Sequence, residues 1–365
     1  MSKKLLLFLF FMGLVYLSWG QAEHNKTIKN PTFIGLSLDY AYILQHTSSL
    51  REIGDAYPTG ISLDWSKLLL NKKAWEFCNC FPRLGVELSY WDFDKRDILG
   101  SGIIALGYAE PYFRTQKKTN LFFRLGLGGT YLTEPFDEQT NPLNNTYSTH
   151  LSLVIMAGIG INYQISNEWN LRMLAKYNHT SNGGINTPNK GINFPSLSIG
   201  VAKSLNPVSY PDYQKIESRQ APENKERISL THFSGWSNAQ VGDKDKFYVF
   251  GFTGHYSRWI GKRSALNAGT EIILDYSRRE LIGSEGNSNS FVQAGALIGH
   301  EFWLGKVTFA QQLGVYYFND YRINDDIYQR YFLSYSFTDK FEAGFGLKAH
   351  LNVADFFDLR VAYRL

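Results

Sequence analysis

Apolar and polar residues alternate along most of this chain, in segments about as long as a membrane-spanning strand of ~9–11 residues. Between residues 34 and 40, for example, every second residue is Ile, Leu or Tyr, and the residues between them are Gly, Ser and Asp. Successive side chains of a strand point to opposite faces, so each segment predicts a strand with one apolar and one polar face. The predicted strands lie near residues 33–44, 58–68, 83–92, 100–110, 120–132, 149–165, 168–181 and 192–204, and then near 228–238, 246–256, 264–276, 290–302, 305–318, 329–338, 340–351 and 355–365.

A polar stretch over residues 206–227 divides these strands into two groups of eight. The stretch contains three prolines and has no period, which predicts a linker. Two groups of eight permit either two small barrels in tandem or one sixteen-stranded barrel. We favour the tandem arrangement, because a linker of 22 residues is longer than a periplasmic turn needs to be. The predicted fold is all-β and antiparallel, with an eight-stranded transmembrane barrel over residues 30–205 and a second eight-stranded, barrel-like domain over residues 228–365.

The N-terminus predicts export. Residues 1–4 include two lysines, residues 5–16 are almost wholly apolar, and small residues follow at Ser18 and Gly20. This pattern is typical of a signal peptide, here residues 1–20, with a mature chain that starts near Gln21. No later segment has the ~18 consecutive apolar residues that a spanning helix needs. An exported membrane protein of this kind must be a barrel, so we expect the chain in the bacterial outer membrane.

Composition agrees with a barrel and narrows the partners. Aromatic residues make up 16% of the chain, which suits strands with aromatic girdles at the membrane surfaces. The net charge is only +4, and the basic residues are scattered, so nucleic acid is not expected as a partner. Cys78 and Cys80 alone cannot complete a zinc site, which leaves two unpaired thiols or a strained bridge as alternatives. We predict no metal and no cofactor.

Inward-facing polar residues are predicted to fill the barrels. An eight-stranded barrel has room inside only for its own side chains, so tandem barrels would conduct nothing. Charged residues buried there normally pair with one another, which favours a structural plug over a catalytic role. The predicted plug residues are Glu87, Arg124, Arg172, Lys176, Glu342, Lys348, His350 and Arg360.

Candidate chemistry lies at the end of the segment 168–181. Residues two apart on a strand share a face, so His179 and Ser181 continue the apolar face that begins at Trp169. If the chain starts in the periplasm, this strand runs outward, and the pair meets lipid near the outer leaflet. On the returning strand, Asn193 shares that face at the same end. A serine, a base and an orienting group are what ester hydrolysis by a serine nucleophile needs.

The spacing of this pair is not distinctive by itself, because the same spacing occurs elsewhere in the chain. It recurs at His46/Ser48, His232/Ser234 and His255/Ser257. Polar residues that anchor a strand end at the membrane surface are therefore the alternative explanation for His179 and Ser181. What distinguishes this pair is the residues around it.

The string His179-Thr180-Ser181-Asn182, with Gly184, Pro188-Asn189 and Gly191-Ile192 after it, resembles the active-site segment of the lipid A 3-O-deacylase (PagL) family of outer-membrane barrels, the bacterial acyloxyacyl hydrolases. The resemblance spans residues 30–205 in strand layout and is specific over 177–201. It implies an eight-stranded barrel whose lipid-facing serine removes an ester-linked acyl chain from lipid A or a related lipopolysaccharide lipid.

By this resemblance, Ser181 would be the nucleophile and His179 the general base. Asn189 and the backbone near Gly184 would donate to the oxyanion, with Asn182 in the same substrate-binding loop. Near the end of the chain, Lys348-Ala349-His350 and Ala354-Asp355-Phe356 also resemble segments of larger, two-part members.

One position departs from the family pattern. Asn193 stands where the family has a glutamate that orients the histidine. An amide can hold an imidazole in the required tautomer, but it gives no charge to stabilise imidazolium. Asp137 or Glu138, on a neighbouring loop, is an alternative source of that charge. The departure also keeps open a non-catalytic barrel with a structural or binding role.

Overall fold

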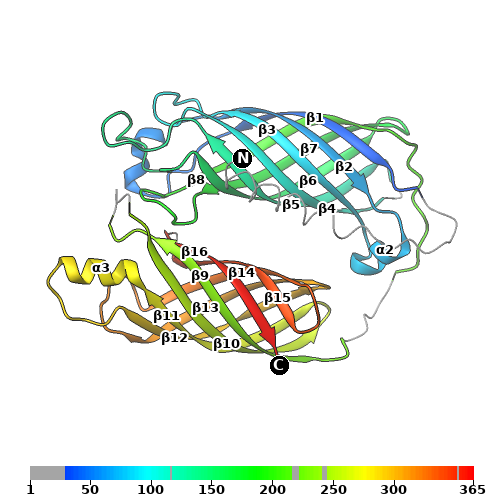
Figure 1. The fold of residues 1–365 in the computed structure, drawn as a ribbon. Helices are drawn as coiled ribbons and strands as arrows, with labels where there is room; N and C mark the ends of the chain where they lie inside the picture. The colour runs from blue at the N-terminus through cyan, green and yellow to red at the C-terminus, as the bar shows by residue number, and fades with distance from the viewer. Residues whose placement is uncertain (1–28, 116, 216–221, 241–244, 352) are drawn as a thin grey trace, which may run out of the picture.

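The computed structural model describes residues 29–115, 117–215, 222–240, 245–351 and 353–365, which form two closed β-barrels (Figure 1). The predicted signal peptide, residues 1–20, lies outside the described residues. None of the described helices is long and apolar enough to cross a membrane.

The first barrel contains eight antiparallel strands in sequence order, closed by pairing of the first with the last. Its strands are β1 (Thr32–Ala41), β2 (Thr59–Leu68), β3 (Phe81–Asp92), β4 (Ser101–Phe113), β5 (Thr119–Leu132), β6 (Leu151–Gln164), β7 (Trp169–Ser181) and β8 (Ile192–Ser204).

The second barrel repeats this arrangement, and β9 pairs with β16 to close it. Its strands are β9 (Glu226–Ser237), β10 (Phe247–Gly261), β11 (Ser264–Asp275), β12 (Val292–Leu304), β13 (Val307–Asn319), β14 (Ile327–Ser336), β15 (Phe341–His350) and β16 (Val353–Arg364). Two separate closures confirm tandem barrels and exclude the alternative of one sixteen-stranded barrel.

Each predicted strand corresponds to an observed one, and the differences lie at ends and in loops. The largest is β10, which continues to Gly261 because it ends in a tight, bulged turn to β11. Three short helices were not predicted: η1 (Ser48–Ile53), α2 (Lys72–Cys78) and α3 (Tyr276–Ser284). Side-chain caps begin the last two, since Asn71 accepts from the Ala74 N–H and Asp275 from the Ser277 and Arg278 N–H groups.

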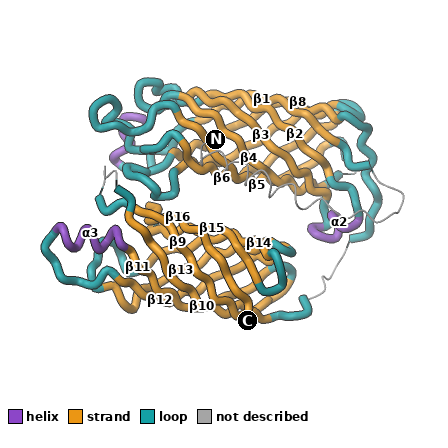
Figure 2. The backbone as a smooth tube through the Cα atoms, viewed as in Figure 1, coloured by secondary structure: helices purple, strands orange, loops and turns teal. Residues whose placement is uncertain are grey.

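The two ends of the first barrel differ. One end, which we call the loop end, carries the long connections 42–58, 93–100, 133–150 and 182–191 (Figure 2). The opposite end carries α2, where Cys78 and Cys80 form a disulfide, so a bridge is the outcome for these thiols. The Trp75 indole of α2 donates to the carbonyl of Gln214, which holds the first part of the linker against this end.

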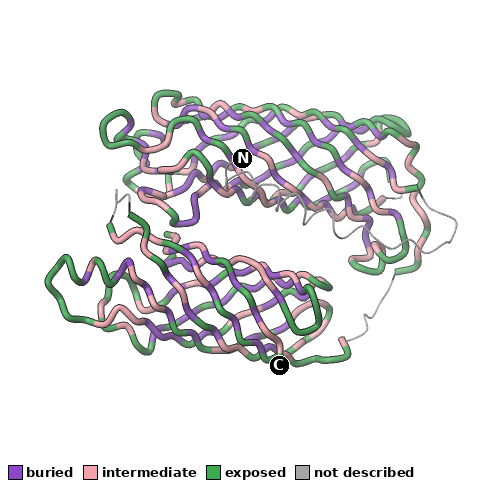
Figure 3. The backbone as a smooth tube through the Cα atoms, viewed as in Figure 1, coloured by how far each residue is buried: buried purple, intermediate pink, exposed green. Residues whose placement is uncertain are grey.

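Burial alternates along the strands, as Figure 3 shows, with charged residues inside and large apolar residues outside. In the first barrel, Glu110 accepts from Arg124 at 2.5 Å and from Arg172 at 2.7 Å. In the second barrel, Asp358 accepts from Arg330 at 2.9 Å and from Arg360 at 2.8 Å. All eight predicted plug residues are buried, which confirms that prediction.

Candidate active site at the loop end of the first barrel

His179 and Ser181 lie on the outer face of β7, where the strand reaches the loop end. The odd-numbered residues from Trp169 to Tyr177 are exposed and the even-numbered ones buried, so the pair continues the outward-facing row. His179 and Ser181 are each half-buried. Asn193, on β8, is the register partner of His179, so the side chains of these two residues are neighbours on one face.

A chain of hydrogen bonds runs from His179 through Asn193 to His46, in the loop after β1. The Nδ1 of His179 lies 2.6 Å from the Oδ1 of Asn193, and the Nδ2 of Asn193 lies 3.1 Å from the Nδ1 of His46. An amide nitrogen only donates, so His46 Nδ1 accepts from Asn193 in the tautomer whose Nε2–H donates to the Lys190 carbonyl at 3.0 Å. In that tautomer the Leu44 carbonyl, 3.2 Å from Nδ1, receives no proton from His46. In this arrangement Asn193 Oδ1 accepts the proton of His179 Nδ1, which leaves Nε2 of His179 as the basic nitrogen.

The hydroxyl of Ser181 contacts the loop that follows it. The backbone N–H of Gly183 donates to the Ser181 Oγ at 3.0 Å, and in the described part of the chain no hydrogen bond joins that hydroxyl to His179. The two side chains meet at Gly191: a Cβ on this glycine would lie 2.9 Å from His179 Cε1 and 3.4 Å from Ser181 Cβ. Gly191, at φ +74°, therefore keeps open the space between imidazole and hydroxyl.

Asparagines shape the loop 182–189. Asn189 Oδ1 accepts from the Asn182 N–H at 3.0 Å, and Asn182 Oδ1 accepts from the Gly184 N–H at 3.0 Å. The Nδ2 of Asn189 is buried without a hydrogen-bond partner among the described residues. A buried, unpaired donor costs free energy, so such a group is a candidate for binding a ligand oxygen. The donors near Ser181 are thus Asn189 Nδ2 and the Gly183 N–H, while the Gly184 N–H is already engaged.

Two families match the chain and between them cover most of it. Residues 57–202 match the family lipid A 3-O-deacylase (PagL), and residues 226–365 match the acyloxyacyl hydrolase C-terminal domain. The chain belongs to the PagL family. Membership in this family of outer-membrane barrels places the protein in the bacterial outer membrane.

Solved structures similar to the chain include two small barrels. The outer membrane enzyme PagL is 15% identical over 46% of this chain and 97% of its own, with a TM-score of 0.34. Neisserial surface protein A is 12% identical over 47% of this chain and 95% of its own, with a TM-score of 0.33. No curated protein sequence matches the chain.

Neither carboxylate suggested as a partner for His179 is seen beside it in this PagL-family barrel. Asp137 accepts from the Gln139 and Thr140 N–H groups within its own loop, and Glu138 is exposed. The group beyond Asn193 is His46, which the sequence distinguishes only by its spacing to Ser48. Closure of the barrel brings it there, because the Leu44 N–H donates to the Asn193 carbonyl at 2.8 Å. Pairing of β1 with β8 places the residues after β1 beside Asn193, so a prediction of this pairing could have identified His46.

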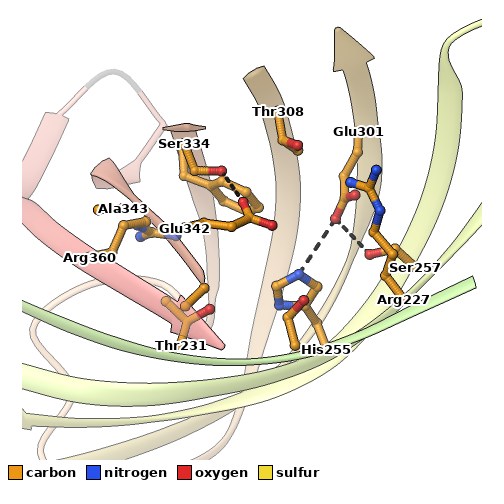
Figure 4. Close-up of a pocket in the computed structure, with 13 residues that line it drawn as sticks. Arg227, Thr231, His255, Ser257, Glu301, Thr308, Ser334, Glu342, Ala343 and Arg360 are labelled. Atoms are coloured by element: carbon orange, nitrogen blue, oxygen red, sulfur yellow. Dashed lines mark hydrogen bonds and ion pairs between the residues drawn. The ribbon is translucent and has the colours of Figure 1, made fainter. Parts of the chain in front are cut away.

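The pair His255/Ser257 shows how differently the same spacing behaves inside a barrel (Figure 4). Both residues point into the second barrel and line a cavity of about 20 Å³, enough for about one water molecule. The Ser257 hydroxyl donates to Glu301 at 2.8 Å, and His255 Nε2 lies 3.6 Å from the same carboxylate. The Ser257 hydroxyl donates its hydrogen bond to a carboxylate and not to His255, so this pair is part of the structural plug.

Proposed function

We propose that this PagL-family protein is an outer-membrane carboxylic ester hydrolase that removes an ester-linked acyl chain from lipid A or a related lipopolysaccharide lipid. Ser181 is the nucleophile, His179 the general base and Asn193 the group that orients it. The observation that carries the proposal is the 2.6 Å hydrogen bond between His179 Nδ1 and Asn193 Oδ1, on the lipid face beside Ser181.

The proposed acylation step uses groups that already surround Ser181. The hydroxyl turns about χ1 from the Gly183 N–H towards His179, whose Nε2 takes its proton as Oγ attacks the ester carbonyl carbon. Asn189 Nδ2 and a backbone N–H of the Gly183–Gly184 segment donate to the oxyanion. The bond between the carbonyl carbon and the lipid oxygen then breaks, and His179 returns the proton to that oxygen.

Deacylation repeats the sequence with water. His179 takes a proton from a water molecule, the hydroxide attacks the acyl-serine, and the fatty acid leaves as Ser181 recovers its proton. The products are the free fatty acid and a lipid with a new hydroxyl group.

In this proposal His46 is a positioning residue for Asn193. An asparagine beside a histidine can present either its oxygen or its nitrogen, and only the oxygen keeps the proton on His179 Nδ1. By accepting from Asn193 Nδ2, His46 selects the orientation in which His179 Nε2 can act as a base. The chain thus uses an amide held by a second histidine where the family resemblance leads one to expect a glutamate.

A non-catalytic barrel with a structural or binding role is the second candidate. Two observations favour it. The hydrogen-bond chain from His179 passes through Asn193 and His46 to a backbone carbonyl and includes no carboxylate. The Ser181 hydroxyl is hydrogen-bonded to the Gly183 N–H and not to His179. It predicts that the purified protein hydrolyses no acylated lipid and that a serine-reactive probe leaves Ser181 unlabelled.

Mass spectrometry of lipid A tests the proposal. Cells with the native protein should yield lipid A that has lost one acyl chain, and cells with Ser181→Ala should retain it. The exposed serine variant Ser49→Ala, in η1, is the matched control and should behave as the native protein does. Identical acylation with and without Ser181 would leave the non-catalytic barrel as the function.

A further inference from the structure

The second barrel contacts the loop that follows Ser181, residues 182–189, which we call the serine loop. The serine loop lies at one end of the first barrel, and the β9–β10 and β15–β16 connections lie at the neighbouring end of the second barrel (Figure 1). Side-chain hydrogen bonds join the two barrels there. The contacts come from two segments of the second barrel: Lys246 with its neighbours just before β10, and the turn into β16.

Lys246 uses its ammonium group to join the two barrels. Its Nζ donates to the Ile185 carbonyl and, at 2.8 Å, to the Asn186 Oδ1 of the serine loop. A third bond, at 2.7 Å, goes to Asn238 Oδ1 in its own barrel. An ammonium has three protons, and these three acceptors surround it. Beside it, the Thr187 hydroxyl donates to the Gln240 carbonyl at 3.3 Å.

The start of β16 meets the two glycines of the serine loop. A Cβ on Gly184 would lie 2.8 Å from the carbonyl oxygen of Asp355 and 2.9 Å from that of Ala354. A Cβ on Gly183 would lie 3.2 Å from the Cβ of Phe357. Both glycines have positive φ, at +71° and +80°, and their lack of a side chain permits this approach.

Side chains inside the second barrel hold the start of β16 in place. Asp355 accepts from Lys348 and from His350 Nδ1, the latter at 3.0 Å, and all three residues flank the β15–β16 turn. Lys348 and His350 are buried, so both contacts are shielded from water. The segments that resemble larger members of the family, around Lys348 and Asp355, therefore form the rigid support beneath Gly184.

A short series of hydrogen bonds leads from Lys246 to the unpaired donor beside Ser181. Asn186, which accepts from Lys246 through its side chain, accepts through its carbonyl from Asn182 Nδ2 at 2.8 Å. Asn182 in turn donates its N–H to Asn189 Oδ1, which leaves Asn189 Nδ2 free. Displacing Lys246 would loosen the bonds that aim this amide.

We propose that the second barrel is a brace for the serine loop, with Lys246 and Phe357 as positioning residues for the oxyanion donors of the first barrel. The inference rests on the proposed ester hydrolysis for its kinetic consequence, and on the contacts alone for its structural one. It gives the second barrel a role although its inward His255/Ser257 pair is part of the plug.

The test uses the full chain and two measurements. Hydrogen exchange of the amides of residues 182–184 reports the serine loop directly, because these N–H groups are donated to Asn189, Ser181 and Asn182. Lys246→Ala and Phe357→Ala should each raise that exchange about tenfold or more. With lipid A in detergent micelles, each should lower kcat about tenfold with little change in KM, because displaced donors act on the transition state.

Matched controls separate bracing from other effects. Arg322→Ala removes another exposed cation at the same end of the second barrel, and Leu359→Ala removes an exposed side chain two residues along β16. A rise in KM for both Lys246→Ala and Arg322→Ala would mean that Lys246 binds lipid phosphate, and would overturn the inference. Native exchange in Lys246→Ala and Phe357→Ala would overturn it as well. A native protein without ester hydrolysis would end the proposed function, and the exchange data would still decide whether the brace exists.

Discussion

The two barrels share strand number, order and an ion-paired interior, yet they put the same pair of residues to different uses. In the first barrel, His179 and Ser181 face outward at the loop end, beside an asparagine and an unpaired amide donor. In the second, His255 and Ser257 face inward, and Glu301 accepts a hydrogen bond from the serine hydroxyl. A shift of one residue in strand register exchanges these situations, because it turns every side chain to the opposite face.

This difference shows that the orientation and the neighbours of a His-x-Ser pair, more than its spacing, give it its chemistry, because His232 and Ser234 on β9 also face outward. An outward pair at the membrane surface can meet an acyl chain, whereas an inward pair in a packed barrel meets only its neighbours and about one water. The experiments below test that contrast, beginning with the largest expected effect.

Replacing the histidine of each pair gives the sharpest contrast. His179→Ala should lower kcat/KM for lipid A deacylation by about a thousandfold or more, since the general base of the serine is lost. His255→Ala should leave kcat/KM within about twofold of native, because Glu301 keeps Ser257, Asn267 and Trp303 as partners. Equal losses in the two variants, measured on purified protein in micelles, would show that the inner pair contributes to the reaction.

The interiors, in contrast, should respond alike. Glu110→Ala leaves Arg124 and Arg172 without their shared carboxylate, and Asp358→Ala does the same to Arg330 and Arg360. Each change should lower the free energy of unfolding by about 3–5 kcal/mol, because two buried guanidinium groups lose the carboxylate that they share. Urea titration in lipid vesicles measures this, with the exposed Glu138→Ala as a control expected within about 0.5 kcal/mol. If the free energy of unfolding fell by much less in one variant than in the other, water would enter the interior of that barrel.

The unpaired amide beside Ser181 provides the next contrast. Asn189→Ala should lower kcat by about a hundredfold, in the range found for single oxyanion donors, with little change in KM. Asn324→Ala, in the β13–β14 connection of the second barrel, removes an amide that contacts His350 and should leave kcat unchanged. If Asn189→Ala changed KM alone, Asn189 would bind the ground-state lipid and not the oxyanion.

The features that the sequence predicted are those with a local cause. A period of two requires only neighbouring residues, so all the strands and the outward orientation of Ser181 could be predicted from it. The helices η1, α2 and α3 lie in loops, where a single capping residue such as Asn71 or Asp275 decides the conformation. His46 and Lys246 could not be found this way, because they lie 147 and 60 residues from their partners Asn193 and Asn186. Barrel closure and the contact between barrels bring these pairs together.

The smallest expected effect concerns His46, and it tests how an asparagine can serve where a carboxylate is usual. His46→Ala frees the Asn193 amide to turn its nitrogen towards His179, which moves the histidine proton to Nε2 and removes the base from part of the molecules. We expect kcat to fall about tenfold, less than on loss of His179 itself, because the oxygen of Asn193 still faces His179 for part of the time. His46→Gln supplies an amide oxygen that can accept from Asn193 Nδ2, so it should recover part of the rate. The control is His150→Ala. His150 is an exposed histidine at the same end that is hydrogen-bonded to the Leu132 carbonyl, and its loss should leave kcat at the native value. Native kcat in His46→Ala would show that the imidazole of His179 keeps its tautomer without help, and that Asn193 alone is sufficient to orient it.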